Sequence, residues 1–70
     1  MENEIREMCI SYLEKAEVIR RRELMSVMDL IRKLDIAYLT FRRININPTT
    51  CSLKTLRKIK KFVDEWNNQQ

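Results

Sequence analysis

The sequence predicts an all-α domain built from four helices, and three observations support that prediction. The chain contains no glycine and a single proline, the two residues that most often mark turns and hairpins. Leu, Ile, Arg, Lys and Glu are abundant, a composition that favours helix over sheet. Apolar residues recur at steps of three and four through most of the 70 residues. A chain of this length holds one domain, so we expect a single compact unit over residues 1–70.

The first expected helix runs from about Glu2 to Glu23 or Leu24. Its apolar residues recur at helical spacing on one face, while Glu and Lys occupy the other. Residues 1–11 extend this helix at its front end. A break near Glu17 would split it and raise the number of helices to five. The apolar face consists of Ile5, Met8, Cys9, Tyr12, Leu13, Ala16 and Ile19.

Two short helices are expected next. Ser26 has the side chain of an N-cap, and an apolar stripe follows it, so we expect a helix over Ser26–Leu34. Asp35 occupies the turn after it, at a position that often needs positive φ. The third helix is expected over Ile36–Ile44. The residues expected to point inward from these two helices are Leu30, Ile31, Leu34, Ile36, Phe41 and Ile44.

A loop and a last helix complete the predicted fold. Asn45–Thr50 reads as the loop, because Pro48 lacks a backbone donor and disfavours a helical residue before it. Ser52 offers a cap for the fourth helix. Its inner face is expected to contain Leu53, Leu56, Ile59, Phe62, Val63 and Trp66.

Charge is unevenly distributed along the chain. Residues 1–17 hold five acidic and two basic side chains, a net charge of −3, and because the whole chain carries +4, residues 18–70 carry +7. A basic body attracts polyanions through counterion release, whereas an acidic end repels them. We therefore expect one nucleic-acid face, with the acidic end pointing elsewhere. The alternative is that the runs Arg20–Arg22 and Lys60–Lys61 are solvated helix faces.

The composition also argues against several kinds of site. With no histidine and two cysteines far apart, Cys9 and Cys51 are interpreted as reduced, half-buried thiols, and we expect no metal and no cofactor. Met8, Met25 and Met28 are interpreted as core residues. No glycine-rich phosphate loop or base-paired nucleophile is present, so we do not expect an enzyme. No run approaches the roughly 20 apolar residues that span a bilayer, and a cytoplasmic protein is expected.

The apolar spacing between Ser26 and Val63 links the last three expected helices. It comprises the inward positions of residues 30–44, followed by the segment Ser-Leu-Lys-Thr-Leu-Arg-Lys-Ile at 52–59. This pattern resembles the lambda-repressor and Cro class of helix-turn-helix DNA-binding domains, over residues 12–63. The resemblance implies that the helix at about 36–44 lies in the major groove while the start of the preceding helix meets the phosphate backbone.

The resemblance also implies which side chains contact DNA. Tyr38 and Leu39 fall where the class places early base-contacting residues, and Arg42 follows one turn later on the same face. Arg42 is suited to a bidentate hold on guanine, worth about 1–3 kcal/mol of discrimination, and Leu39 to a thymine methyl group. The residues expected at DNA phosphates are Ser26, Arg43 and Lys54.

The chain departs from the class at several positions. Val27 replaces a glutamine that bonds a phosphate. Asn45 replaces a glutamate that pairs with the arginine at position 20, so we expect Arg20 to be solvated. Leu24 and Asp35 stand where glycines are common, so the turns are expected to differ locally.

The N-terminal extension has two possible partners. The class has a fifth helix that supports dimerisation, and this chain has no counterpart after Trp66. The stripe of Ile5, Met8, Cys9 and Tyr12 is expected to pack on the Trp66 region of its own chain or, alternatively, of a second copy, which would make a homodimer.

Three functions are consistent with these features. The leading one is a small sequence-specific DNA-binding regulator, repressor-like and of the size found in phage, plasmid and mobile-element circuits. Its rival is a protein-binding module, an inhibitor or anti-repressor of the same fold, favoured by Val27, by the exposed Tyr38-Leu39 pair and by the acidic front end. A nucleic-acid binder without sequence preference ranks last, because most aromatic residues have core positions.

Overall fold

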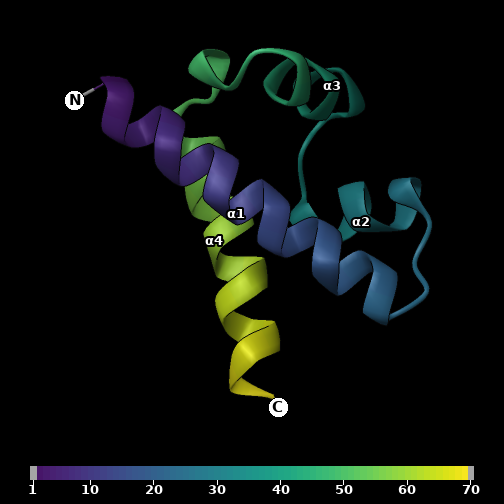
Figure 1. Cartoon of the computed structure of the whole chain (residues 1–70). Helices are drawn as coiled ribbons and strands as arrows, with labels where there is room; N and C mark the ends of the chain where they lie inside the picture. Colours follow the sequence, from purple (N-terminus) through teal and green to yellow (C-terminus); the bar gives the residue numbers. More distant parts are fainter. Residues whose placement is uncertain (1, 70) are drawn as a thin grey trace.

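The chain folds as four α-helices and one short 3₁₀ helix in a computed structural model, which describes residues 2–69 (Figure 1). The helices are α1 (Glu2–Arg22), α2 (Val27–Leu34), α3 (Tyr38–Ile46) and α4 (Leu53–Asn68), and the 3₁₀ helix η1 (Pro48–Thr50) joins α3 to α4. No strand occurs among the described residues. The all-α prediction is therefore confirmed, and the molecule measures 32 × 24 × 16 Å.

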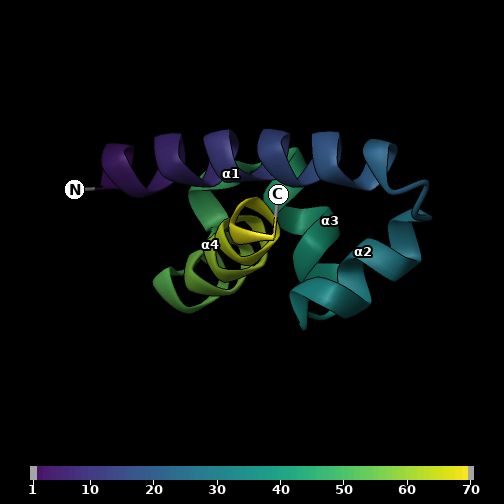
Figure 2. The same cartoon turned by 90° about the horizontal axis from the view of Figure 1, so that it is seen from below.

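Helix α1 lies along one side of the molecule, and the other helices all pack on the same side of it (Figure 2). It runs without a break through Glu17, so the five-helix alternative is wrong. Helix α4 crosses α1 and makes the most extensive contact with it. Despite the 21 residues of α1, no helix in residues 2–69 combines the length and apolar character needed to cross a membrane.

The core contains most of the residues that the helical spacing placed there. Their burial removes apolar surface from water, the main favourable contribution to folding. Around them pack partly buried side chains that include Ile5, Tyr12, Met25 and Trp66. The buried residues of this core are Cys9, Ala16, Ile19, Leu30, Leu34, Ile44, Cys51, Leu56, Ile59 and Val63.

Some core predictions were wrong. Leu53 is about half exposed because it is the first residue of α4, and side chains tilt toward the N-terminus of their helix, here past the edge of the core. Met8 and Met28 are similarly exposed, so only Met25 of the three methionines packs on the core. Cys9 and Cys51 are buried, not half-buried, at 0% and 6% exposure.

The turns around α2 have the capping that the sequence indicates. The Ser26 hydroxyl accepts a hydrogen bond from the Asp29 backbone N–H at 3.1 Å. At the other end, Asp35 adopts φ 58°, ψ 47°, the left-handed conformation that glycine readily takes, so the local difference expected of this turn is not observed. The Lys58 ammonium donates a hydrogen bond of 2.7 Å to the Asp35 carbonyl, which ties this turn to α4.

Helix α3 is shifted by two residues from its expected range of 36–44. Ala37 remains extended at φ −71°, ψ 146°, so the helix begins at Tyr38. It continues through Asn45 and Ile46, residues that were assigned to the loop. Proline restricts only the residue directly before it, and that residue, Asn47, is the one that leaves the helix at φ −139°. The shift adds the exposed residues Asn45 and Ile46 to the end of α3.

Candidate nucleic-acid interface

The three side chains expected to contact bases are exposed together at the start of α3. Tyr38 is 46% exposed and Leu39 is 69% exposed, and Arg42 is exposed beside them. The Arg42 guanidinium lies over the Tyr38 ring, 5.9 Å from its centroid, as residues four apart on one helix face do. Residues Tyr38 and Arg42 therefore lie on one surface, where a ligand can reach both.

A groove runs along the outer side of α3 toward η1. It is open, encloses about 420 Å³, and is lined by Leu39, Arg42, Arg43, Ile46, Asn47 and Thr50. Ile46 is 78% exposed and belongs to this surface, although the sequence analysis placed it in a loop. The spacing 39, 42, 43 and 46 is that of a single helix face, and it would have identified Ile46 had the helix been extended by two residues.

The inner side of α3 holds it in place. Ile44 is buried in the core, and Phe41 packs against the core from the preceding turn. At the first residue of the helix, the Ala37 cap makes no side-chain hydrogen bond. The first-turn N–H groups of α3 therefore have no side-chain acceptor from their cap, and such groups suit an anion or water.

Some basic residues of the chain form ion pairs with carboxylates, and others do not. The basic runs noted in the sequence are partly paired, since their five cations meet three carboxylates. Arg20 and Arg21 pair with Glu17, Lys60 pairs with Asp64 and Lys61 pairs with Glu65.

In contrast, within residues 2–69 no carboxylate lies at ion-pair distance from Arg42 or Arg43. Helix α3 also contains no acidic residue. The unpaired charge on this helix makes its exposed face suitable for a polyanion.

The residues expected at phosphates are less tightly grouped. Arg43 lines the groove with Leu39 and Arg42, whereas Ser26 and Lys54 do not. Ser26 is exposed at the start of α2, where its oxygen is occupied by capping but its hydroxyl hydrogen remains available to an acceptor. Lys54 is exposed in the first turn of α4. These two residues are thus on the elements that precede and follow α3.

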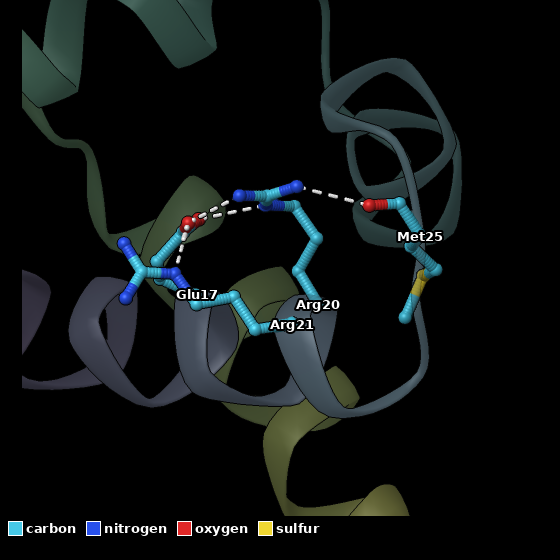
Figure 3. Close-up of polar contacts among 4 residues, drawn as sticks. All are labelled: Glu17, Arg20, Arg21 and Met25. Carbon is cyan, nitrogen blue, oxygen red and sulfur yellow. Dashed lines mark hydrogen bonds and ion pairs between the residues drawn. The ribbon is translucent and has the colours of Figure 1, made fainter.

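Arg20 is not solvated, contrary to the expectation from the sequence. Its Nε and Nη2 atoms donate to the Glu17 carboxylate at 3.0 and 2.6 Å, and its Nη1 donates to the Met25 carbonyl at 2.9 Å (Figure 3). The hydrogen bond from Arg20 is the main reason that the pKa of Glu17 is below its usual value. Glu17, one turn earlier on α1, is therefore the partner of Arg20.

Asn45 has a different role in this chain. Its side-chain amide donates to the Phe41 carbonyl at 2.8 Å, within α3 itself. The Arg20 cluster therefore connects α1 to the chain entering α2 without involving α3. The sequence offered a signal for this arrangement, since Glu17 and Arg20 have the i, i+3 spacing of a helical ion pair.

The Trp66 region packs on its own chain. The indole N–H donates to the Glu23 carboxylate at 2.7 Å, and the Arg22 guanidinium lies 5.9 Å from the Trp66 ring centroid. Ile5 and Tyr12 also pack against the core of the same chain. Of the stripe offered to a second copy, only Met8 is among the exposed large apolar residues. Arg22 and Glu23 lie at the opposite end of α1 from Ile5 and Tyr12, so these contacts do not join the N-terminal stripe to Trp66 as expected, and a homodimer stays a proposal.

Comparisons of this chain with protein-family models, with curated proteins and with solved structures find no match.

Proposed function

We propose that this protein is a small sequence-specific DNA-binding regulator that reads the major groove with α3. One observation carries the proposal: α3 exposes Tyr38, Leu39 and Arg42 together, beside an Arg43 that also lacks a carboxylate partner among residues 2–69. An α-helix with its side chains is about 10–12 Å across and the major groove is about 12 Å wide, so α3 fits that groove. The resemblance to the lambda-repressor and Cro class supports the same orientation.

The proposed roles follow from the chemistry of each side chain. Arg42 donates two parallel hydrogen bonds to guanine O6 and N7, and stacking on Tyr38 restricts its rotamers in advance. Leu39 contacts a thymine methyl group. Ser26, Arg43 and Lys54 bind phosphates. These contacts fix the register of the protein on the duplex without reading its sequence. A regulator of this kind acts by occupying its site and excluding polymerase, and a cytoplasmic location belongs to the same proposal.

A salt titration tests the electrostatic part of the proposal. We would measure the affinity for a labelled duplex of random sequence over a range of salt concentrations, for the wild type and for Arg43→Ala. The logarithm of the binding constant should fall steeply with the logarithm of salt concentration, and losing one phosphate contact should reduce that slope by about 1.

The control variant is Lys61→Ala. It removes the same charge from an exposed site on α4 where Glu65 already pairs with it. We expect its slope to match the wild type. Binding that is independent of salt would count against α3 as the contact surface. An equal reduction of the salt slope in both variants would do the same.

A second candidate function is supported by the apolar part of the groove. Leu39 and Ile46 are exposed large apolar residues on the helix that carries the unpaired arginines, and Val27 is exposed at the start of α2. Such a surface also suits an acidic, amphipathic protein segment, as an inhibitor or anti-repressor would use. This alternative predicts that the Arg42→Ala variant still binds the protein partner and that the Ile46→Ala variant does not. It also predicts that the wild type has no affinity for duplex DNA.

A homodimer is the remaining proposal on partners. It would use α1 around Met8 and the Trp66 region. Sedimentation at high micromolar concentration tests it, because a monomer there would eliminate the dimer while leaving DNA binding untouched.

A further inference from the structure

One face of α1 carries opposite charges at its two ends. Helix α1 lies along one side of the molecule, so much of its length is open to solvent (Figure 2). Glu4 and Glu7 are exposed near the front of the helix, and Lys15 and Arg22 are exposed toward its end. None of these four side chains forms an ion pair within residues 2–69. We call this face the α1 stripe; its members recur at alternating steps of four and three and are Glu4, Met8, Ser11, Lys15, Val18 and Arg22.

The rear part of the α1 stripe borders a hollow between α1 and α4. This open hollow encloses about 290 Å³, and its lining includes Lys15, Val18 and Arg22 from α1 and Trp66 from α4. Val18 is an exposed large apolar residue, and the Arg22 guanidinium lies 5.9 Å from the Trp66 ring centroid. The hollow thus combines apolar surface with two cations. It suits an apolar side chain that is accompanied by carboxylates.

The front part of the α1 stripe has the complementary chemistry. Met8 is exposed there, near Glu4 and Glu7. A methionine side chain is flexible, fills irregular gaps and makes favourable contacts with aromatic rings, so it fits a hollow that contains an indole. Within one chain the two parts cannot meet, because Met8 and Val18 are roughly 15 Å apart along a rigid helix. A second copy of the chain is the occupant that supplies one part to the other.

We propose that two copies of this chain pair through the α1 stripe in antiparallel orientation, about a two-fold axis beside Leu13. Met8 of each copy enters the hollow beside Val18 of the other. Because the interface is isologous, the same contacts form twice. The stripe is symmetric about Leu13 in the sequence, since its members lie at equal distances on either side of that residue. The rotation therefore matches Glu4 with Arg22, Met8 with Val18 and Ser11 with Lys15.

The charges select the antiparallel orientation. A parallel pair would place Glu4 against Glu4 and Arg22 against Arg22, whereas the antiparallel pair lays the front carboxylates of each copy along the rear cations of the other. Exposed ion pairs contribute about 0–1 kcal/mol each, so they set the orientation more than the affinity. One helix face and two hollows form a small interface of the weak, transient class. We therefore expect the dimer at high micromolar concentration.

This inference rests on the homodimer proposed above and gives it a defined interface. It leaves the proposed DNA surface free, because within residues 2–69 the groove of α3 has no lining residue from α1. Dimerisation and DNA binding can therefore be measured separately.

Exchange of charges between the two ends of the α1 stripe tests the pairing. The front variant is Glu4→Lys with Glu7→Lys, and the rear variant is Lys15→Glu with Arg22→Glu. Sedimentation equilibrium without DNA and at low salt gives the dimer dissociation constant. Each variant alone should dimerise at least roughly 10-fold more weakly than the wild type, because like charges meet at both ends. An equimolar mixture of the two should recover the wild-type affinity, because opposite charges meet again.

The control variant is Glu14→Lys with Glu65→Lys. It changes the net charge as the front variant does, but at exposed sites outside the α1 stripe. It should dimerise more strongly than the front variant, and its mixture with the rear variant should dimerise less than the mixture of the front and rear variants. Circular dichroism checks that each variant remains folded.

Cysteine cross-linking tests the orientation independently of charge. Met8→Cys mixed with Val18→Cys should give a disulfide-linked dimer under mild oxidation, because the two positions face each other. Each variant alone should not, because two copies of position 8, or of position 18, lie roughly 15 Å apart in an antiparallel pair, too far for a disulfide. The native cysteines are buried and do not compete.

The outcomes separate this interface from the other proposals. A wild type that is monomeric at high micromolar concentration would overturn both the homodimer and this interface. A wild-type dimer whose affinity the charge exchange does not recover would overturn this interface alone, as would cysteine variants that cross-link only with themselves. Neither result bears on DNA binding, which the salt titration tests.

Discussion

Replacing Leu24 with glycine should stabilise this protein. Leu24 adopts φ 55° directly after α1, one of two positive-φ residues in the described chain. Its N–H donates to the Arg21 carbonyl at 3.3 Å, and the next N–H, of Met25, donates to the Arg20 carbonyl at 2.9 Å. These are the two hydrogen bonds of a Schellman motif, in which the residue at Leu24's position is usually glycine.

The size of the effect follows from what the leucine side chain costs and contributes here. A non-glycine residue in the left-handed region costs about 1–2 kcal/mol. The greater freedom of glycine in the unfolded chain offsets about 0.5–1 kcal/mol of that gain. Leu24 is 92% exposed, so its removal loses almost no apolar burial. We therefore expect a net stabilisation of about 0.5–1 kcal/mol, which for a domain of this size raises the melting temperature by roughly 2–8 °C.

The matched control is Leu24→Ala, which removes the same exposed side chain but keeps a Cβ atom in the left-handed conformation. Urea unfolding followed by circular dichroism gives the free energy of unfolding for all three proteins. Leu24→Ala should remain close to the wild type, and Leu24→Gly should exceed both. A glycine variant no more stable than the alanine variant would refute the strain argument.

Three further predictions concern the core and the α1–α2 connection. Arg20→Lys should lower the melting temperature more than Arg21→Lys, because a lysine cannot reproduce the three hydrogen bonds that Arg20 donates; equal effects would dismiss the cluster as incidental. In reducing buffer, unfolding free energy should fall between pH 9 and about 12 more steeply in the wild type than in Cys9→Ala, because the folded pKa of Cys9 lies above its unfolded value and ionisation favours the unfolded chain; superimposable pH profiles would contradict this. Leu56→Ala should cost about 2–5 kcal/mol and the half-exposed Leu53→Ala under about 1 kcal/mol in urea unfolding; a reversed order would mean that the inner face of α4 is misassigned.

Local rules predicted most of the fold. Ser26 and Ser52 were expected to cap α2 and α4, and each accepts a backbone hydrogen bond from three residues ahead. Leu30 and Ile59, placed by helical spacing, are fully buried. These features depend on a few neighbouring residues, which is why a single sequence shows them. The turns at Leu24 and Asp35 were expected to differ locally because neither residue is glycine, and this was wrong, since both residues adopt positive φ.

The features that were missed depend on helix ends or on contacts between distant segments. Ile46 was assigned to a loop because the influence of Pro48 was extended two residues too far. Arg20 was expected to lack a partner because only position 45 was considered, whereas Glu17 lies one turn away. Cys9 and Cys51 were expected to be half-buried, but their burial depends on segments distant in the sequence, which no local pattern connects.

Selection of binding sites from random duplexes at physiological salt tests most directly whether α3 reads DNA. The proposal predicts that the wild type enriches a short motif containing guanine, and that Arg42→Ala loses the preference at that guanine while retaining the rest of the motif. A wild-type protein that enriches no motif, or an Arg42→Ala variant that enriches the same one, would contradict the proposal.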